Sequence, residues 1–534
     1  MMNRGLSILL LGTATAFAAE RPNLLFLFAD DWGRHAGVYA EIDGPGTMNE
    51  IIRTPHFDRL AREGVLFNHA YVSAPSCTPC RSSLLSGQHF WRTKTGAVLT
   101  SAWDDSIPSY PLLLEQAGYH IGFSNKVWGP GAPADAPYGG ERNKYNHAGR
   151  SICNISYPVA AAMKNGIPAE EVKQEVMDQV RRNFRDFLDA REEGKPFCFW
   201  FGPTTTHRSW VKGSGAAQWG LDPDALKGKM PPYLPDVPEV REDLADYFGQ
   251  VMAFDMAIGV FVDELKRIGE YENTIIAVSG DHGAPGFPQG KCNLYDFGSR
   301  VPLVFSGPGI KGGRLVEDFV SLPDLAPTFL EAGNVEVPEV MTAKSLWPVL
   351  KSEKSGRVDP TRTQVYIGRE RHVPSARAGN LPYPQRAIRT RDYLFIINFE
   401  PGRYPMGDPV RLDGAEEPTA GELAKKTKAT LADWDAGPTK AWMVTHRDDP
   451  ACKPYFERSF GKRPRLELYD LKKDPHQMNN VAQQPEYREV MDKLEKKLMT
   501  ELRATGDPRV IDGGRYFEKQ EKFAEAYRNV MKNK

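Results

Sequence analysis

An excess of charge of either sign is missing from this chain. Its 534 residues carry 68 Lys and Arg against 69 Asp and Glu, a formal net charge of −1. A protein that binds nucleic acid or a membrane surface through its overall field needs a dominant basic charge. The balance therefore argues against both kinds of partner, and leaves room for a local basic site that binds a small anion.

Cysteine is also scarce. Six cysteines in 534 residues do not make a disulfide scaffold, although one or two bridges stay open. The hydrophobic share of 41% and the charged share of 26% are typical of a globular protein that buries a sizeable core. The length is enough for two or more domains, and one large α/β core is also compatible with it.

The N-terminus lacks an apolar run long enough to cross a bilayer as a helix. Arg4 precedes the short apolar run 6–17, and Ala16-Phe17-Ala18 is a small-x-small cleavage signal. Residues 1–18 therefore predict a signal peptide on an exported protein, periplasmic or secreted, with no membrane span. No cysteine follows the run, which argues against a lipid anchor. The alternative is a buried N-terminal helix.

Short apolar runs alternate with helical patterns from residue 19 to about 355. The runs at 23–29, 65–72, 119–123, 197–201, 274–278 and 301–305 are typical of buried strands. This alternation predicts an α/β domain over 19–355, with a mostly parallel sheet flanked by helices. Beyond 355 the helical periodicity weakens, which predicts a smaller C-terminal α+β subdomain over 356–534 that contributes to the substrate pocket.

Two of the predicted strands end in paired polar residues, Asp30-Asp31 and Asp281-His282. Adjacent carboxylates repel each other unless a cation neutralises them, and oxygen-rich sites suit Ca²⁺ or Mg²⁺. Each pair alone is better explained as a turn or a helix cap. Two pairs at the ends of two buried strands favour a metal site.

Three further polar residues, Lys126, His207 and Lys291, follow strands. Cations that converge on one point stabilise an anion, whereas a single lysine is usually a solvated surface charge. Another basic concentration lies between 369 and 391, where six arginines and His372 accompany one acid. That stretch predicts contacts with a polyanionic substrate through Arg369, His372 and Arg386, or else a loop of solvated arginines.

The stretch Cys77-Thr78-Pro79-Cys80-Arg81 precedes a helical pattern. A helix N-terminus favours negative charge, so a reactive group there, with Arg81 one turn on, suits an anionic substrate. The alternative is a Cys-x-x-Cys redox or metal pair.

With these residues assembled, the chain resembles the formylglycine-dependent type I sulfatases of the alkaline-phosphatase superfamily. The family pattern Cys-x-Pro-x-Arg is present as 77–81. Further matching motifs follow in the family's order: Phe28-Ala29-Asp30-Asp31, Thr54-Pro55-His56-Phe57-Asp58, Ser279-Gly280-Asp281-His282-Gly283, Gly290-Lys291 and Glu467-Leu468-Tyr469-Asp470.

The resemblance implies a set of roles. Cys77 is expected to be oxidised to formylglycine, by a formylglycine-generating enzyme or an anaerobic sulfatase-maturating enzyme, and to act as the nucleophile. A Ca²⁺ is expected on Asp30, Asp31, Asp281, His282 and the residue made from Cys77. Arg81 is expected to orient the nucleophile, and Lys126, His207 and Lys291 to contact the sulfate, with His207 or Lys291 protonating the leaving group.

Within the family the chain is most similar to the heparan N-sulfatase branch, through Ser76-Cys77-Thr78-Pro79, Asn293-Leu294-Tyr295, Thr206-His207-Arg208, Tyr383-Pro384-Gln385-Arg386 and Asp474-Pro475-His476. It departs from the family pattern at Trp128, where a histidine is usual, and Lys291 stands where this branch can carry arginine. The expected activity is hydrolysis of a sulfate ester or a sulfamate of a sulfated saccharide. Two substrates compete: N-sulfoglucosamine ends, and O-sulfates of a polysaccharide.

Two other functions fit the sequence less well. A phosphatase or phosphodiesterase of the same superfamily uses Ser or Thr as nucleophile and usually two zinc ions with more histidines, whereas this chain has 11 His and a cysteine at that position. A saccharide-binding protein on an inactive sulfatase fold would not need the full set of ligand and cation positions.

Overall fold

A central eight-stranded sheet organises the protein. The computed structural model describes residues 21–414 and 416–532, so the predicted signal peptide, 1–18, lies outside the described residues. The strands run in the order β10-β2-β9-β7-β1-β6-β4, with β8 paired to β2. Their bounds are β1 (Asn23–Ala29), β2 (Val65–Tyr71), β4 (His120–Asn125), β6 (Phe197–Gly202), β7 (Thr274–Gly280), β8 (Arg300–Val301), β9 (Leu303–Ser306) and β10 (Arg314–Ser321).

The sheet is mostly parallel, as the sequence predicts, but it is mixed. β1 pairs in parallel with β6 and β7, β4 with β6, and β10 with β2. The apolar run expected at 301–305 instead forms two short strands, β8 and β9, which pair antiparallel with β2 and β7. Pro302 separates them, and a proline cannot donate to the hydrogen-bond ladder of a continuous strand.

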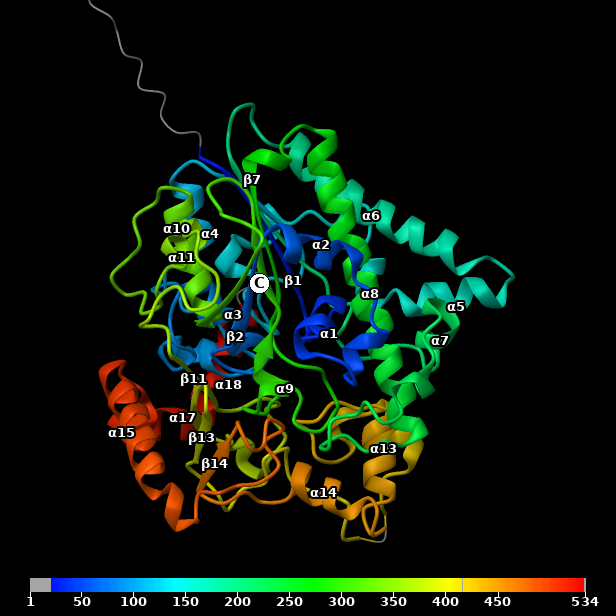
Figure 1. Ribbon diagram of the computed structural model, residues 1–534, viewed down its shortest axis with the longest axis vertical. Helices are drawn as coiled ribbons and strands as arrows, with labels where there is room; N and C mark the ends of the chain where they lie inside the picture. The colour runs from blue at the N-terminus through cyan, green and yellow to red at the C-terminus, as the bar shows by residue number, and fades with distance from the viewer. Residues whose placement is uncertain (1–20, 415, 533–534) are drawn as a thin grey trace, which may run out of the picture.

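Helices cover both faces of the sheet (Figure 1). Leu25 and Leu27 of β1 face a cluster that includes side chains of α2 (Pro55–Glu63), α6 (Ala169–Asp189) and α8 (Pro238–Arg267). Leu24 and Phe26 point the other way, into a cluster with α3 (Cys77–Ser86), α4 (Tyr110–Gln116) and α10 (Leu325–Ala332). This alternation explains why β1 is apolar throughout: both of its faces are buried.

Helix α8 is apolar and long enough to cross a membrane by length and composition. In this structure 94% of its apolar window is buried inside the protein, so it serves as a core helix. The remaining helices of the large domain are short: α1 (Gly37–Asp43), α5 (Ser156–Lys164), α7 (Ser214–Trp219), α9 (Asp296–Ser299) and α11 (Trp347–Lys351).

A second, antiparallel sheet forms the C-terminal subdomain, at the carboxyl ends of the central strands (Figure 1). Its strands are β11 (Gln364–Arg369), β12 (Gln385–Thr390), β13 (Tyr393–Asn398) and β14 (Leu466–Asp470). Its helices are α12 (Ala420–Lys425), α13 (Pro438–Thr445), α14 (Lys453–Phe460), α15 (Arg488–Ala504), α16 (Pro508–Ile511), α17 (Arg515–Glu518) and α18 (Gln520–Lys532). The arginine-rich stretch therefore contributes two strands, which the sequence did not predict.

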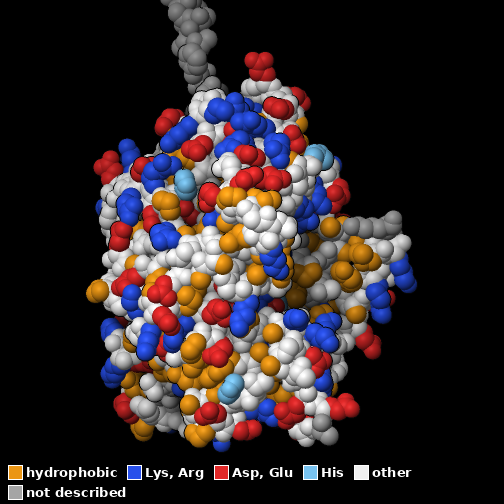
Figure 2. Space-filling model, turned by 90° about the vertical axis from the view of Figure 1, so that its right-hand side faces the viewer, with side chains coloured by type: hydrophobic (Ala, Val, Ile, Leu, Met, Phe, Trp, Pro, Cys, Tyr) orange, Lys and Arg blue, Asp and Glu red, His pale blue; other side chains and the backbone are white. Residues whose placement is uncertain are grey.

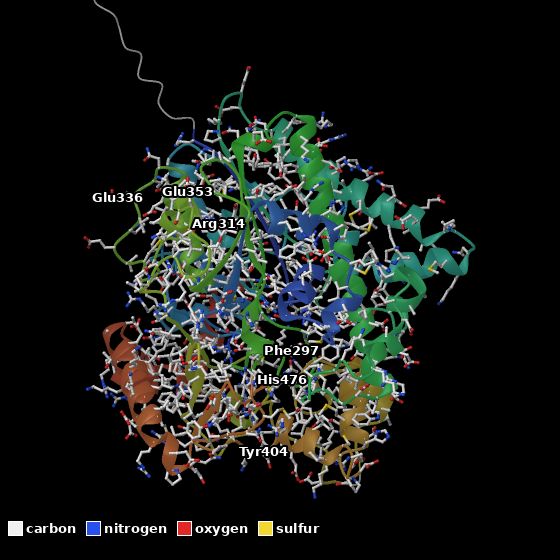
Figure 3. All side chains as sticks on the ribbon, in the orientation of Figure 1. Phe297, Arg314, Glu336, Glu353, Tyr404 and His476 are labelled. Carbon is white, nitrogen blue, oxygen red and sulfur yellow. The ribbon has the colours of Figure 1, made fainter. Side chains whose placement is uncertain are left out.

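The two parts pack closely. Phe297 of α9 and His476 of the subdomain lie at their junction (Figure 3), and both rings contact Tyr233, at 5.3 and 6.1 Å between ring centroids. Arg389 of β12 also forms an ion pair with Asp296 of α9, at 2.7 Å. The subdomain is thus held against the strand ends at which the sequence places its polar pairs.

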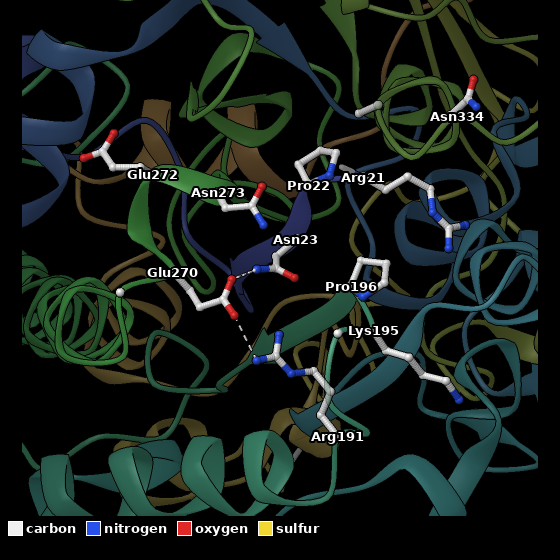
Figure 4. Close-up of a pocket in the computed structure, with 13 residues that line it drawn as sticks. Arg21, Pro22, Asn23, Arg191, Lys195, Pro196, Glu270, Glu272, Asn273 and Asn334 are labelled. Carbon is white, nitrogen blue, oxygen red and sulfur yellow. Dashed lines mark hydrogen bonds and ion pairs between the residues drawn. The ribbon is translucent and has the colours of Figure 1, made fainter. Parts of the chain in front are cut away.

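On the face of the protein that Figure 2 shows, basic and acidic side chains are interspersed, in keeping with the balanced composition. A cavity of about 1230 Å³ opens at the amino ends of the central strands (Figure 4). Its Glu270 already accepts hydrogen bonds from Asn23 Nδ2, at 2.8 Å, and Arg191 Nη2, at 3.0 Å. Because it opens at the amino ends of the strands, this cavity lies at the opposite end of the sheet from the predicted site.

Candidate active site at the carboxyl ends of the central strands

Cys77 is the first residue of helix α3, which is the next helix or strand after β2. Ser76 precedes it with extended backbone, and every residue of α3 from Cys77 to Ser86 is buried. The unpaired N–H groups of a first helical turn carry partial positive charge. A group built on Cys77 therefore meets an anion at the positive end of a buried helix.

The paired residues predicted to bind a metal come from neighbouring strands. β1 and β7 are in register to Ala29 and Gly280, so the residues that follow each strand meet at the sheet edge. The Asp31 N–H donates to Asp281 Oδ1 at 2.7 Å. His282 Nε2 lies 3.2 Å from Asp31 Oδ1. The two pairs thus form one cluster, as predicted.

This cluster fits a divalent cation. One ligand atom each from Asp31, Cys77, Asp281 and His282 lies within 4.8 Å of the others, and Asp30, Asp31 and His207 form a second such group. Buried carboxylates in close proximity need positive charge to balance them. Carboxylate oxygens suit a hard cation such as Ca²⁺, and an imidazole nitrogen is also compatible with transition metals, so the donor set supports a divalent ion without specifying which.

Arg81 braces the acidic cluster from inside. Its Nε donates to Asp281 Oδ2 at 2.9 Å and its Nη2 to Asp30 Oδ1 at 3.0 Å. Its Nη1 donates to the carbonyl oxygens of Lys126 and Val127, both at 3.1 Å. The side chain is 0% exposed. Through these hydrogen bonds, Arg81 fixes both the carboxylates and the loop after β4.

Both predicted lysines reach the cluster. Lys126 Nζ lies 2.7 and 2.8 Å from the two carboxylate oxygens of Asp30, and Lys291 Nζ lies 3.1 and 3.0 Å from those of Asp31. Burial alone would lower the lysine pKa values, but Asp30 raises the pKa of Lys126 and Asp31 that of Lys291, so both stay cationic. Burial opposes the lowered pKa of Asp30, and the charges of Lys126 and Arg81 outweigh it.

His207 lies at the outer side of the cluster. It follows β6, its side chain is 33% exposed, and its Nε2 is 4.0 Å from Asp31 Oδ2. Its Nδ1 contacts the carbonyl oxygen of Arg208, which fixes the ring and leaves Nε2 toward the acidic cluster. This position suits contact with a bound ligand, in agreement with the place that the sequence assigned to it.

The surroundings of Cys77 and Cys80 argue against a redox pair. Burial, followed by the nearby carboxylate of Asp30 for Cys77 and of Asp281 for Cys80, raises the pKa of each thiol well above its usual value. A neutral thiol is a poor nucleophile. Cys77 Sγ lies 3.5 Å from His282 Nε2, whereas Cys80 belongs to the hydrophobic cluster behind α3. The two cysteines therefore have different environments.

Trp128 occupies the position where the sequence comparison expects a histidine. Its Nε1 donates to Ser82 Oγ at 2.8 Å, and its ring packs edge-on against Trp103, with the centroids 5.7 Å apart. The N–H groups of Val127 and Trp128 donate to Asp135 Oδ1. Trp128 thus packs the loop that carries Lys126 against α3, and is a core residue here.

In the arginine-rich stretch, the predicted saccharide contacts Arg369 and Arg386 are buried in ion pairs. Arg386 is 0% exposed and pairs with Asp507 and Glu370, while Arg369 pairs with Asp433 at 2.6 Å. The Arg369 and Arg386 side chains are 1% and 0% exposed, so the predicted substrate contact has no support from this geometry. The two arginines instead hold the subdomain together, because β11 and β12 bury them.

His372 lies nearer the candidate site. Its Nδ1 is 2.7 Å from Ser76 Oγ, directly before Cys77. Burial lowers the pKa of His372 to about 3, so the ring is neutral. It therefore supports the turn before α3, and its predicted contact with a saccharide stays a prediction.

Asp435 is a candidate residue that sequence reasoning missed. Its Oδ2 lies 3.6 Å from Lys291 Nζ. Asp435 and His207 line one cavity of about 630 Å³, together with Tyr157 and Trp210. In the sequence, Asp435 is one of 69 acidic residues in a polar, irregular segment, and no motif singles it out.

Comparisons with known proteins show the family of this chain. Residues 22–335 match the sulfatase family, and residues 284–402 match the C-terminal region of N-sulphoglucosamine sulphohydrolase. The chain is 29% identical to human N-sulphoglucosamine sulphohydrolase over 94% of its length and 93% of the relative, and 24% identical to an ulvan-active sulfatase of Formosa agariphila over 91% and 76%.

A solved structure described as a complex with its substrate D-glucosamine-2-N,6-O-disulfate superposes with a TM-score of 0.59 at 20% identity, over 93% of this chain and 100% of the other. That likeness concerns the fold. The family match covers more than half of the chain, and includes Cys77 and the clustered residues around it. The chain belongs to the sulfatase family and is a sulfuric ester hydrolase.

Proposed function

We propose that the protein is an exported sulfatase that removes sulfate from a sulfated saccharide, through a formylglycine made from Cys77. The observation that carries the proposal is the position of Cys77, which heads buried helix α3 beside Asp31 and His282. The raised pKa of the unmodified thiol makes Cys77 itself a weak nucleophile. Conversion to an aldehyde hydrate removes that limitation.

The surrounding cations support sulfate chemistry. A sulfate ester carries its charge on oxygens that Lys126 and Lys291 can neutralise from two sides, while Arg81 fixes the carboxylates of Asp30 and Asp281. A divalent cation held by Asp30, Asp31, Asp281 and His282 would supply Lewis-acid polarisation. We propose Ca²⁺ for it, since most of the donors are carboxylate oxygens.

The reaction proceeds in two steps. One hydroxyl of the formylglycine hydrate attacks sulfur, the bond from sulfur to the saccharide breaks, and His207 or Lys291 gives the leaving atom its proton. The second hydroxyl then loses its proton, the aldehyde carbonyl re-forms, and the carbon–oxygen bond to the sulfate breaks. Inorganic sulfate and the aldehyde result, and water restores the hydrate.

For the substrate we propose the N-sulfoglucosamine end of a heparin-like chain. The support is the match of residues 284–402 to the C-terminal region of N-sulphoglucosamine sulphohydrolase, and the likeness to the human enzyme of that name over nearly the whole chain. The similarity to an ulvan-active sulfatase keeps O-sulfated polysaccharides as the competing substrate. A formylglycine-generating enzyme or an anaerobic sulfatase-maturating enzyme is the proposed partner, and residues 1–18 are the proposed export signal.

The test combines modification with turnover. Protein produced with a maturating enzyme is analysed by mass spectrometry of the peptide that contains Cys77, and is then assayed for sulfate release from N-sulfoglucosamine and from O-sulfated mono- and oligosaccharides. We expect activity to follow the modified fraction. Full activity with an unmodified Cys77 would refute the mechanism, and release from O-sulfates alone would refute the proposed substrate.

A further inference from the structure

We propose that Asp435 is a specificity residue, which accepts hydrogen bonds from hydroxyl or amine groups of the sugar next to the scissile sulfate. The inference rests on the proposed function, and adds to it a residue from the C-terminal subdomain. Asp435 and His207 line the same cavity of about 630 Å³, and Asp435 Oδ2 is 3.6 Å from Lys291 Nζ. A sugar attached to a sulfate at Lys291 and His207 therefore extends past this carboxylate.

The carboxylate of Asp435 is ionised, and its Oδ2 has no hydrogen-bond donor in the part of the chain that the structure describes. The side chain is 16% exposed. Burial opposes the charge, but Lys291 and then His207 outweigh it and hold the pKa of Asp435 well below its usual range. An ionised carboxylate has room for about four donors, so this one has unused acceptor capacity beside the cavity.

Two other acids in the same region already accept hydrogen bonds on both carboxylate oxygens. Asp433 accepts from Arg369 Nη2 at 2.6 Å and from the Val373 N–H at 2.8 Å, and pairs with Arg377 at 2.8 Å. Asp246, which also lines the cavity, accepts from two backbone N–H groups, at 2.8 and 2.7 Å. These carboxylates hold the fold, whereas Asp435 holds none of the described residues by a hydrogen bond.

The segment that presents Asp435 is rigidly fixed. Lys440 Nζ donates to the carbonyl oxygens of Thr427, Leu431 and Trp434, at 3.0, 3.3 and 2.8 Å. Together with the hydrogen bonds that Asp433 accepts, these bonds fix the chain on the N-terminal side of Asp435. A preorganised acceptor costs little ordering when the ligand binds, which is the property of a residue that selects substrates.

The charge of Asp435 fits this role. A free carboxylate beside the sulfate repels further anionic groups and attracts hydrogen-bond donors. A site built to hydrogen-bond a substrate hydroxyl or amine discriminates strongly against an analogue that lacks it, because the acceptor is then left unpaired. The amine that remains after N–S cleavage, or a neighbouring ring hydroxyl, supplies such a donor.

The test compares D435N and D435A with the fully modified wild type. We expect kcat/KM for the sulfated monosaccharide that the wild type hydrolyses best to fall about 10- to 100-fold, since one hydrogen bond to a charged group is lost. The inhibition constant of inorganic sulfate, which occupies the sulfate position alone, stays within about twofold if Asp435 contacts the sugar. E242Q is the matched control, because Glu242 undergoes the same charge change nearby while pairing with Lys212 at 3.2 Å.

Three results would overturn the inference. An unchanged kcat/KM in D435A shows that the carboxylate is not used. Equal losses for the saccharide and for sulfate inhibition show that Asp435 acts only through Lys291. A wild type with confirmed formylglycine that hydrolyses no sulfated saccharide overturns the proposed function, and this inference with it. Mass spectrometry and the melting temperature of each variant separate these results from loss of modification or of folding.

Discussion

Two sets of buried charges lie within one molecule and have opposite consequences. At the ends of the central strands, Asp30, Asp31 and Asp281 face Arg81, Lys126 and Lys291. In the C-terminal subdomain, Arg369 and Arg386 face Asp433, Glu370 and Asp507. Both sets consist of short ion pairs with almost no exposure, and residue type alone does not tell them apart.

The difference lies in what each set leaves unused. Arg386 gives its Nε and Nη2 to two carboxylates and its Nη1 to backbone carbonyls, so a ligand finds nothing there. At the strand ends, Asp31, Asp281 and His282 converge with Cys77, and His207 is one-third exposed beside them. A buried charge set has a structural role when its charges pair with one another away from solvent, and is a candidate site when ligand atoms converge beside an opening.

The largest expected effect separates Cys77 from Cys80. C77A removes the precursor of the nucleophile, and we expect kcat/KM to fall by about 10⁴-fold or more. C80S, in the hydrophobic cluster behind the helix, should keep kcat within about threefold while unfolding at a lower temperature, because a hydroxyl is buried without a partner. Sulfate release and thermal melting measure the two effects. Comparable losses in both variants would restore the paired-cysteine reading.

Chelation tests the strand-end set as a whole. Removal of a divalent cation leaves Asp31 and Asp281 less neutralised at the sulfate position, and we expect turnover to fall about 10³-fold. Added Ca²⁺ should restore it, followed over a series of divalent ions by sulfate release and by metal analysis. Turnover that persists in metal-free protein, as shown by that analysis, would contradict the assignment of Asp31, Asp281 and His282.

The arginine set is tested by stability. R386A leaves Asp507 and Glu370 buried without their common partner, and we expect the free energy of unfolding to fall by about 3–5 kcal/mol. R391A is the control, because the Arg391 side chain is 59% exposed and its removal should change stability by less than about 0.5 kcal/mol. Denaturant unfolding measures both. A stable R386A protein with weakened saccharide binding would return Arg386 to the substrate site.

The smallest effect concerns a buried acid, Asp255, that forms no ion pair among the residues the structure describes. Burial raises the pKa of Asp255 on α8 to about 7, although the N–H groups of His56 and Phe57 donate to its oxygens. Between pH about 4 and 7 the folded state then binds more protons than the unfolded state, so stability falls as pH rises through this window. D255N removes that slope.

We expect the stability of D255N relative to the wild type to improve by roughly 2–3 kcal/mol from pH 5 to pH 8. Denaturant unfolding at the two pH values measures it, and D263N, an exposed acid on the same helix, is the control. If the free energies of unfolding of D255N and the wild type differ by the same amount at both pH values, ionisation of Asp255 does not destabilise the folded state.

Much of the large domain follows from local sequence. The apolar run 23–29 gives β1 with those bounds, and the run 274–278 lies within β7, because strands buried on both faces need apolar side chains at every position. The polar pairs that follow them meet because β1 and β7 are adjacent in parallel. The strands β10, β11 and β12 were not anticipated, since β10 and β11 mix polar with apolar residues and β12 carries two arginines.

The sequence by itself determined the chemistry of the site: Cys77 before a helix, Asp30-Asp31 and Asp281-His282 at strand ends, and the lysines that follow strands. Only the tertiary structure decided which charged groups are paired by hydrogen bonds within the protein. Arg386 is hydrogen-bonded to Asp507, 121 positions away, and Asp433 to Arg369, 64 positions away. Asp435, two residues after Asp433, has no donor to its Oδ2 among the described residues. A hydrogen-bond inventory depends on contacts between distant segments, which short-range patterns do not encode.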